Sequence, residues 1–285
     1  MEKLRVAIQK SGRLSEKSLL LFAECDITLD SGGGRLLASS QDFPIEVLYL
    51  RDDDIPQYVA DGVSDIGIVG ENVINEKGKM LTITEKLGFG KCRLSLAIPK
   101  QENYSGIGYF NSKRIATSYP NILKEFLIKK NINAEIHEIS GSVEIAPGIG
   151  LADSIFDIVS SGSTLFSNNL KEVEIVQYSE AVMIEHENLS QVKRNILDDM
   201  IFRIRSVQKA KKNKYILLNA PNENLNEIIN LIPGMKSPSV VPLAKAGWSS
   251  LHSVIEEKDF WSVIDKLKQK GAQGILVIPL EKMIL

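Results

Sequence analysis

A short strand that ends in a loop of hydroxyl side chains constrains the fold of this chain most. Residues 154–159 (SIFDIV) have the apolar pattern of a buried strand, and residues 164–170 predict a helix. Between them, residues 160–164 (SSGST) form a tight loop in which Gly162 permits a positive φ. Backbone N–H groups at a helix start and nearby hydroxyls bind anions. The stretch therefore predicts an α/β fold with a phosphate cup.

Acidic side chains accompany this loop. Asp157 lies three residues before Ser160, so its carboxylate can accept hydrogen bonds from hydroxyls of the molecule that carries the phosphate. Glu144 lies further upstream, in a predicted small-residue helix or turn. A carboxylate beside a phosphate cup suggests a sugar phosphate as ligand. The alternative is that residues 160–164 form only a Ser/Gly-rich turn that caps a helix.

Charge and cysteine usage exclude several classes of protein. The 34 Lys and Arg residues nearly balance the 36 Asp and Glu residues, so bulk charge predicts neither a nucleic-acid nor a membrane partner. The two cysteines and three histidines are scattered, which argues against a zinc site or a Cys/His catalytic pair. Residues 1–12 lead directly into a strand and lack a signal-peptide core. We expect a cytoplasmic, reduced protein.

Cations follow two predicted strands near the amino terminus. Lys10 and Arg13 follow the strand at residues 4–8, and Arg51 follows the strand at residues 45–50. Open α/β sheets bind ligands at the carboxyl ends of their strands, so these cations are candidates for phosphate contacts. Solvated surface charges are the alternative. Glu71 likewise opens a helix at the end of the strand at residues 63–70.

Local signals also predict helix starts and connections. Ser15 is a candidate N-cap for a helix at residues 14–25, and an Asp before Ile55 is a candidate N-cap for a helix that reaches about residue 62. Residues 31–34 (SGGG) predict a hairpin-like connection, because neither a dinucleotide fingerprint nor a P-loop pattern surrounds them.

The last part of the chain has a different pattern. Strands and helices alternate as βαββαβ over some seventy residues from Lys214, the order of a ferredoxin-like module. All arginines precede this module, the last being Arg205. Arginine, the cation best suited to binding phosphate, is thus confined to the part of the chain before this module. We expect chemistry in the first part and binding or assembly in the second.

Five motifs together resemble one family. They are QKSGRL (residues 9–14), RDDDIP (51–56), DGVSDIGIVGEN (61–72), KRIATSYP (113–120) and the stretch at 141–165. In this order they resemble the ATP phosphoribosyltransferases, which catalyse the first step of histidine biosynthesis, and the tail resembles the regulatory domain of the long form. The resemblance covers essentially the whole chain. The cup reads SSGST where the family pattern is nearer STGAT, which keeps the glycine and the final threonine.

The resemblance implies a fold and a reaction. The fold is a two-lobed, type II periplasmic-binding-protein-like core (residues 1–90 with 181–210, and 91–180) plus a ferredoxin-like regulatory domain (211–285). The reaction condenses ATP with phosphoribosyl pyrophosphate, with Mg²⁺ shielding the leaving pyrophosphate. The family also implies histidine as feedback inhibitor and a homohexamer.

Roles for individual residues come with the resemblance. The phosphoribosyl pyrophosphate site would comprise Asp153, Asp157, Ser160, Ser161, Gly162, Ser163 and Thr164. The ATP site would comprise Lys10, Gly12, Arg13, Arg51, Glu71 and Tyr119. The catalytic groups would be Lys10, Arg51, Glu71 and Glu144. Neither the Mg²⁺ ligands nor the residues of the histidine pocket follow from the motifs.

Several alternatives stay open at this level. A non-catalytic cytosolic sensor with the same two-lobed fold would show a similar pattern, as would an inactive homologue that acts as a regulatory partner. Tyr119 can stack a base or can only pack before Pro120. Glu144 can serve the site or can only stabilise a helix N-terminus.

Overall fold

The computed structural model describes residues 2–30 and 36–284. The chain divides into two compact units, Met1–Leu197 and Asp198–Leu285, and helix α6 (Gln191–Lys211) runs through the boundary. The predicted connection at residues 31–34 lies outside the described residues. No helix in the described ranges is both long and apolar enough to span a membrane.

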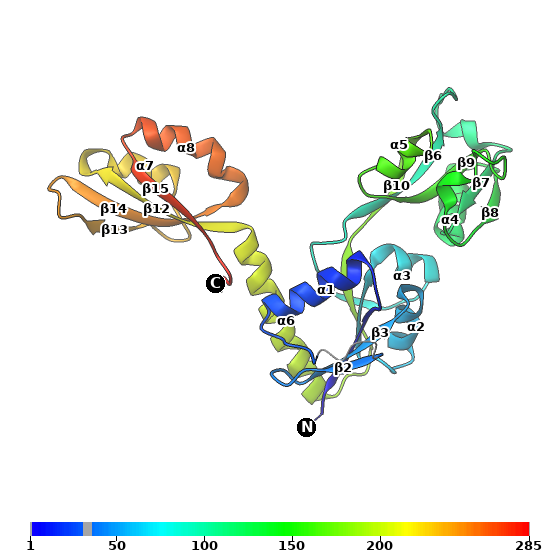
Figure 1. Cartoon of the computed structure of the whole chain (residues 1–285), viewed down its shortest axis with the longest axis horizontal. Helices are drawn as coiled ribbons and strands as arrows, with labels where there is room; N and C mark the ends of the chain where they lie inside the picture. Colours follow the sequence, from blue (N-terminus) through cyan, green and yellow to red (C-terminus); the bar gives the residue numbers. More distant parts are fainter. Residues whose placement is uncertain (1, 31–35, 285) are drawn as a thin grey trace. The chain divides into compact units, whose positions relative to one another are not determined.

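The first unit contains a six-stranded sheet in the order β2-β3-β1-β4-β11-β5 (Figure 1). Strand β1 pairs in parallel with β3 and β4, whereas β11 returns antiparallel to β4. The strands are β1 (Leu4–Gln9), β2 (Leu37–Ser39), β3 (Ile45–Leu50), β4 (Ile66–Gly70), β5 (Thr82–Lys86) and β11 (Ala181–Glu185). The helices of this lobe are α1 (Arg13–Glu24), η1 (Asp52–Asp54), α2 (Ile55–Ala60) and α3 (Glu71–Lys77).

Strand β4 shows why this sequence packs as it does. Its residues Ile66, Ile68 and Val69 are fully buried, as a central strand covered on both faces requires. A Cβ at Gly67 would lie 2.6 Å from a methyl carbon of Ile55 on α2. Glycine is therefore needed at this position for the helix to approach the sheet closely.

A five-stranded sheet in the order β10-β6-β9-β7-β8 forms the second lobe of this unit. Strands β7, β8 and β9 run parallel to one another, and β6 is antiparallel to both β9 and β10. The strands are β6 (Cys92–Pro99), β7 (Arg114–Thr117), β8 (Glu135–Glu138), β9 (Ser154–Val159) and β10 (Leu170–Ser179). The helices are η2 (Ile107–Phe110), α4 (Pro120–Lys130), η3 (Val143–Ile145) and α5 (Ser163–Ser167).

The second unit has the predicted βαββαβ order and a four-stranded sheet, β13-β14-β12-β15. Helices α7 and α8 cover one face of this sheet (Figure 1), where Ile216, Leu218, Leu251 and Leu267 form a buried core. The elements are β12 (Asn213–Pro221), η4 (Asn222–Asn224), α7 (Leu225–Leu231), β13 (Ser239–Pro242), β14 (Trp248–Glu256), η5 (Glu257–Asp259), α8 (Phe260–Gln269) and β15 (Gln273–Pro279).

Three local expectations differ from the structure. The helix after the hydroxyl loop is only five residues long, because Asn169 takes a left-handed conformation and Leu170 already pairs with β6. Helix α1 starts at Arg13 with Gly12 as N-cap, so Ser15 is a buried residue inside the helix. Asp54 is the N-cap of α2 but its side chain makes no capping hydrogen bond.

Candidate active site

The loop after β9 has the geometry of an anion cup. Gly162 has φ 82° and ψ 1°, a left-handed conformation that favours glycine, and it directly precedes α5. The first N–H groups of a helix have no acceptor within the helix. That of Ser163 donates to the hydroxyl of Ser161 at 3.4 Å, and Ser163 and Thr164 are both exposed. The hydroxyls of Ser161 and Ser163 lie 3.0 Å apart. Since a five-residue helix has a small dipole, these donors rather than the dipole make the cup.

Two carboxylates lie close enough beside the cup to interact. The pKa of Asp157 is raised to about 6, mainly by burial and to a smaller extent by the Glu144 carboxylate, while the N–H of Ile158 lowers it. Asp157 lies on β9 and Glu144 on η3, so the structure brings together two acids that the sequence separates by 13 positions. A half-buried Asp157 is thus an ionised acceptor at neutral pH that binds a proton in mild acid.

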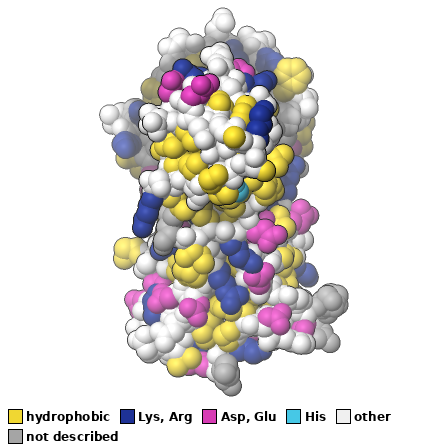
Figure 2. All heavy atoms as spheres, turned by 90° about the vertical axis from the view of Figure 1, so that its left-hand side faces the viewer, with side chains coloured by type: hydrophobic (Ala, Val, Ile, Leu, Met, Phe, Trp, Pro, Cys, Tyr) yellow, Lys and Arg dark blue, Asp and Glu magenta, His cyan; other side chains and the backbone are white. Residues whose placement is uncertain are grey.

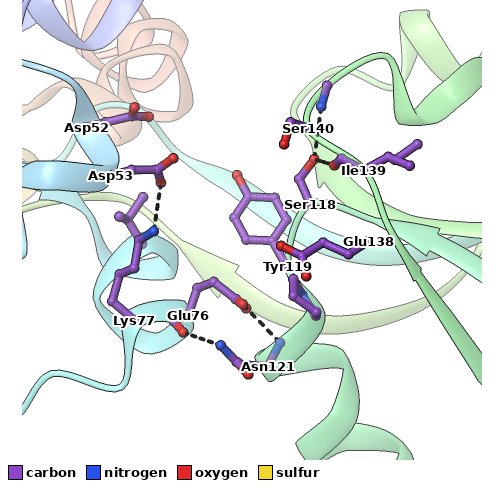
Figure 3. Close-up of a pocket in the computed structure, with 13 residues that line it drawn as sticks. Asp52, Asp53, Glu76, Lys77, Ser118, Tyr119, Asn121, Glu138, Ile139 and Ser140 are labelled. Carbon is purple, nitrogen blue, oxygen red and sulfur yellow. Dashed lines mark hydrogen bonds and ion pairs between the residues drawn. The ribbon is translucent and has the colours of Figure 1, made fainter.

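A cavity of about 690 Å³ lies between elements of the two lobes. Figure 3 shows the Tyr119 ring projecting into it, between Asp52 and Asp53 on one side and Glu138 on the other. Burial raises the pKa of the Tyr119 hydroxyl, and the charges of Asp157, Asp52 and Asp53 raise it further. Tyr119 therefore stays protonated and lies near both the β9 acid and the acids that follow β3. The remaining lining residues include Val73, Glu76, Lys77, Ser118, Asn121, Ser140 and Gly141.

Asp52 and Asp53 are more than the helix caps that the sequence suggested. Burial, followed by the neighbouring Asp53 charge, raises the pKa of Asp52. Both residues line the cavity, and Asp53 lies 3.9 Å from Lys77. Their position at the end of a strand, next to Arg51, was the available sequence signal. Nowhere in the described ranges are three His, Cys, Asp or Glu side chains grouped to hold a metal ion.

Strand register places the predicted cations together. Gln9 of β1 is paired with Leu50 of β3, so Lys10 and Arg51 follow neighbouring strand ends, and the N–H of Lys10 donates to the carbonyl of Leu50 at 2.7 Å. Lys10, Arg13 and Arg51 are exposed, and none of them forms an ion pair with any residue in the described ranges. Gly12 has φ 95° as the N-cap of α1, which leaves a second exposed helix start beside these cations.

Two predicted site residues lie elsewhere. Asp153 precedes β9, at the opposite end from the cup, and the guanidinium of Arg114 binds it and lowers its pKa. Strand β9 has six residues and is roughly 20 Å long, and it separates Asp153 from the cup, so the structure does not bring Asp153 to the cup. Glu71 lies where the lobes connect, 3.5 Å from Lys86, in a separate small cavity with Cys92, Ser179 and Glu180.

These features define a class of protein: a two-lobed α/β transferase core, with a hydroxyl loop before a helix and cations at strand ends, followed by a ferredoxin-like domain. Comparison with known proteins is consistent with this class. The sequence profile of ATP phosphoribosyltransferase matches residues 51–206, and that of the HisG C-terminal domain matches residues 210–282. The chain belongs to the ATP phosphoribosyltransferase family, whose members are pentosyltransferases of histidine biosynthesis.

Relatives match over nearly the full length. The ATP phosphoribosyltransferase of Azobacteroides pseudotrichonymphae is 60% identical over 99% of this chain and 100% of its own, and that of Cytophaga hutchinsonii is 59% identical over 99% and 98%. A chain of the Thermotoga maritima ATP phosphoribosyl transferase (HisG:HisZ) complex has 30% identity and a TM-score of 0.62, covering 71% of this chain and 98% of that one. The predicted family and fold class are confirmed.

Proposed function

We propose that this chain condenses ATP with phosphoribosyl pyrophosphate between its two lobes. N1 of adenine forms a bond to C1 of the ribose, the bond from C1 to the pyrophosphate oxygen breaks, and pyrophosphate leaves with the electron pair. The observation that carries the proposal is the cup at residues 160–164 beside Asp157. The cup would bind the 5′-phosphate, and Asp157 would accept hydrogen bonds from the ribose hydroxyls.

The remaining roles follow from position. Lys10, Arg13 and Arg51 are exposed cations at strand ends, suited to the ATP phosphates or the departing pyrophosphate. Tyr119 projects into the cavity and would contact the base (Figure 3). Glu144, near Asp157, would stabilise positive charge that develops at the ribose carbon. With such placement and electrostatics, no covalent intermediate is required.

The reaction would use Mg²⁺, bound mainly through substrate. This ion prefers one or two carboxylates together with phosphate oxygens and water. Asp52 and Asp53 offer such a pair at the cavity, and a bound cation would relieve the repulsion that helps raise the pKa of Asp52. When bound, Mg²⁺ neutralises charge on the leaving pyrophosphate. The protein would work in the cytoplasm, consistent with its two cysteines not being joined in a disulfide.

We further propose the domain division expected from the sequence: residues 1–90 with 181–210, residues 91–180, and residues 211–285. The strand ends support these boundaries, since β5 ends at Lys86 and β6 begins at Cys92, while β10 ends at Ser179 and β11 begins at Ala181. The last division lies just before β12, which begins at Asn213.

Histidine inhibition is assigned to the second unit. A cavity of about 580 Å³ there is lined by Tyr215, His252, Met235 and Val254 among others. At the polar edge of this cavity, the Tyr215 hydroxyl forms a hydrogen bond with Nδ1 of His252, at 2.6 Å. An apolar pocket with few placed polar groups suits a small amino acid.

A homohexamer is supported by the uncovered face of the C-terminal sheet. Leu217 lies opposite Leu276, and Tyr215 lies opposite Ile278, on the side away from α7 and α8. Leu276 and Ile278 remain 55% and 46% exposed. On the side of the molecule that Figure 2 draws, exposed hydrophobic side chains lie among charged ones. Large exposed apolar patches mark interaction surfaces.

Pyrophosphate release from ATP and phosphoribosyl pyrophosphate in the presence of Mg²⁺ tests the proposal. We expect Asp157→Ala and Thr164→Ala each to raise the KM for the sugar pyrophosphate, since a lost charged hydrogen bond is worth about 1–3 kcal/mol. A sensor without catalysis would bind ligand but release no pyrophosphate at high protein concentration. An inactive regulatory homologue would respond to neither substitution.

A further inference from the structure

The guanidinium of Arg93 joins the phosphate cup to the neighbouring strands. Arg93 lies on β6, opposite Val159, the last residue of β9 before the cup. Its Nη1 donates to the carbonyl oxygen of Ser160 at 3.0 Å. Its Nε and Nη2 donate to the two carboxylate oxygens of Glu172 on β10, at 2.5 and 2.6 Å. One side chain thus contacts both the first residue of the cup and an acid on the far strand.

Glu172 holds this guanidinium in one orientation. A bidentate pair fixes the plane of an arginine, unlike a single ion pair. Glu172 also accepts a hydrogen bond from the hydroxyl of Ser95 at 2.6 Å, which fixes the carboxylate in turn. The Arg93 hydrogen bonds lower the pKa of Glu172 below its ordinary value, so the acid remains ionised. The side chains of Arg93 and Glu172 are only 25% and 23% exposed, which limits their other conformations.

The contact to Ser160 has a consequence for the cup. In a trans peptide the carbonyl of one residue and the N–H of the next point in opposite directions. All peptide bonds in the described ranges are trans. When Arg93 holds the Ser160 carbonyl, the N–H of Ser161 must therefore point away from Arg93. This N–H then joins that of Thr164 as a donor for an anion, while the N–H of Ser163 donates to the hydroxyl of Ser161 at 3.4 Å.

We propose that Arg93 is a positioning residue for the phosphate cup, held in place by Glu172. It does not touch the substrate; it fixes the peptide between Ser160 and Ser161 so that the N–H is aligned before phosphate binds. The inference rests on the proposed function, in which the cup binds the 5′-phosphate of phosphoribosyl pyrophosphate. The competing explanation is that the ion pair only ties β6 to β10.

The chain offers a matched control for that explanation. Arg114 on β7 forms the same kind of group, with its guanidinium on Asp153 and its Nη1 on the carbonyl of Gly150 at 3.2 Å. This group lies at the opposite end of β9 from the cup. Arg93→Lys and Arg114→Lys each keep the charge but lose the bidentate geometry. Purely structural roles therefore predict the same kinetic behaviour for both variants.

Steady-state kinetics with each substrate varied in turn, on the full-length protein, test the proposal. For Arg93→Lys we expect the KM for phosphoribosyl pyrophosphate to rise about tenfold, the order of a lost charged hydrogen bond, with the KM for ATP unchanged. Glu172→Gln should shift the same constant in the same direction by a smaller factor. Arg114→Lys should leave both constants unchanged. Calorimetric titration with phosphoribosyl pyrophosphate alone should show the same loss of affinity.

The outcomes distinguish a positioning role of Arg93 from a purely structural one. Equal behaviour of Arg93→Lys and Arg114→Lys, or a parallel rise in both KM values, overturns the positioning role. If Arg93→Lys does not fold, Glu172→Gln carries the test alone, and an unchanged KM for phosphoribosyl pyrophosphate overturns it. If Gly162→Ala, which alters the cup directly, also leaves that KM unchanged, the cup is not the phosphate site. That result refutes the proposed site together with the positioning role.

Discussion

The carboxylate of Glu76 on α3 caps the N-terminus of α4, a helix of the other lobe. Its Oε1 accepts a hydrogen bond from the N–H of Asn121 at 2.9 Å, and its Oε2 accepts one from the N–H of Ile122 at 3.0 Å. Tyr119, the N-cap of α4, provides no side-chain cap of its own. An acid from one lobe thus satisfies the first N–H groups of a helix in the other, beside the cavity (Figure 3).

We expect Glu76→Gln to destabilise the protein by about 1–2 kcal/mol, the range for a lost charged cap. Glutamine has one acceptor oxygen, and its NH₂ group would face an N–H of α4. Urea denaturation measures the change. Lys77→Gln is the control, since it removes an exposed charge near Asp53 and Asp52 and should cost less than about 0.5 kcal/mol. Equal losses in the two variants would contradict a cap that joins the lobes.

The activity should fall in mild acid. Because burial and Glu144 raise the pKa of Asp157 to about 6, the carboxylate that we propose binds the ribose hydroxyls is lost below that pH. We expect kcat/KM for phosphoribosyl pyrophosphate to decline as the pH falls through about 6, since this ratio reports groups of the free enzyme. Glu144→Gln should move the inflection to lower pH. An inflection that does not move would show that another group titrates.

Protonation of Asp157, which should lower the activity, should raise the stability of the fold. The pKa of Asp157 rises from an ordinary value of 3.8 in the unfolded chain to about 6 in the folded protein, so the folded state binds more protons between these values. The contribution of Asp157 to the free energy of unfolding therefore decreases as the pH rises through this window. Asp157→Asn should remove that component, which urea titrations at several pH values would detect.

Gly162→Ala should separate backbone strain from ligand binding. An alanine at φ 82° is strained by about 1 kcal/mol, and the nearest side-chain atom to the new Cβ is 4.0 Å away, so no clash adds to the strain. Gly150→Ala, at φ 76° with nothing within 4 Å, is the matched control in the same lobe. Both should lose similar stability by thermal denaturation. Only Gly162→Ala should raise the KM for phosphoribosyl pyrophosphate; an equal rise in both would refute the cup.

On the proposed role of the second unit, Tyr215→Phe should weaken inhibition by histidine without changing the uninhibited rate. The substitution removes only the hydroxyl that is bonded to His252, at the edge of the cavity in the second unit. We expect the histidine concentration for half inhibition to rise several-fold, on the order of one neutral hydrogen bond. Lys258→Ala, which breaks an exposed pair with Glu256, is the control. Unchanged inhibition in Tyr215→Phe would place the inhibitor elsewhere.

The local sequence pattern predicted most helices and strands, because the conformational preference of the residues and the burial that their positions require favoured the same element. The strands before Lys10, Arg51 and Glu71 ended within one residue of the expected position, since a charged residue follows each largely apolar run, whereas β4 begins at Ile66 and not at residue 63. The helix after the cup was predicted too long because Leu170 suits a helix and a strand equally. Pairing of β10 with β6, which is distant in sequence, decided between them.

By itself, the amino-acid sequence determined the order of the elements, the ferredoxin-like tail, the hydroxyl cup around Gly162 and the family. These depend on periodicity and on residue types at short spacing. The tertiary structure alone decided which charges meet. It placed Glu76 on α4, Arg93 on Ser160 and Glu172, and Tyr119 near Asp52 and Asp157. It also separated Asp153 from the cup. Such contacts join strands and lobes far apart in the chain, and local pattern carries no information about them.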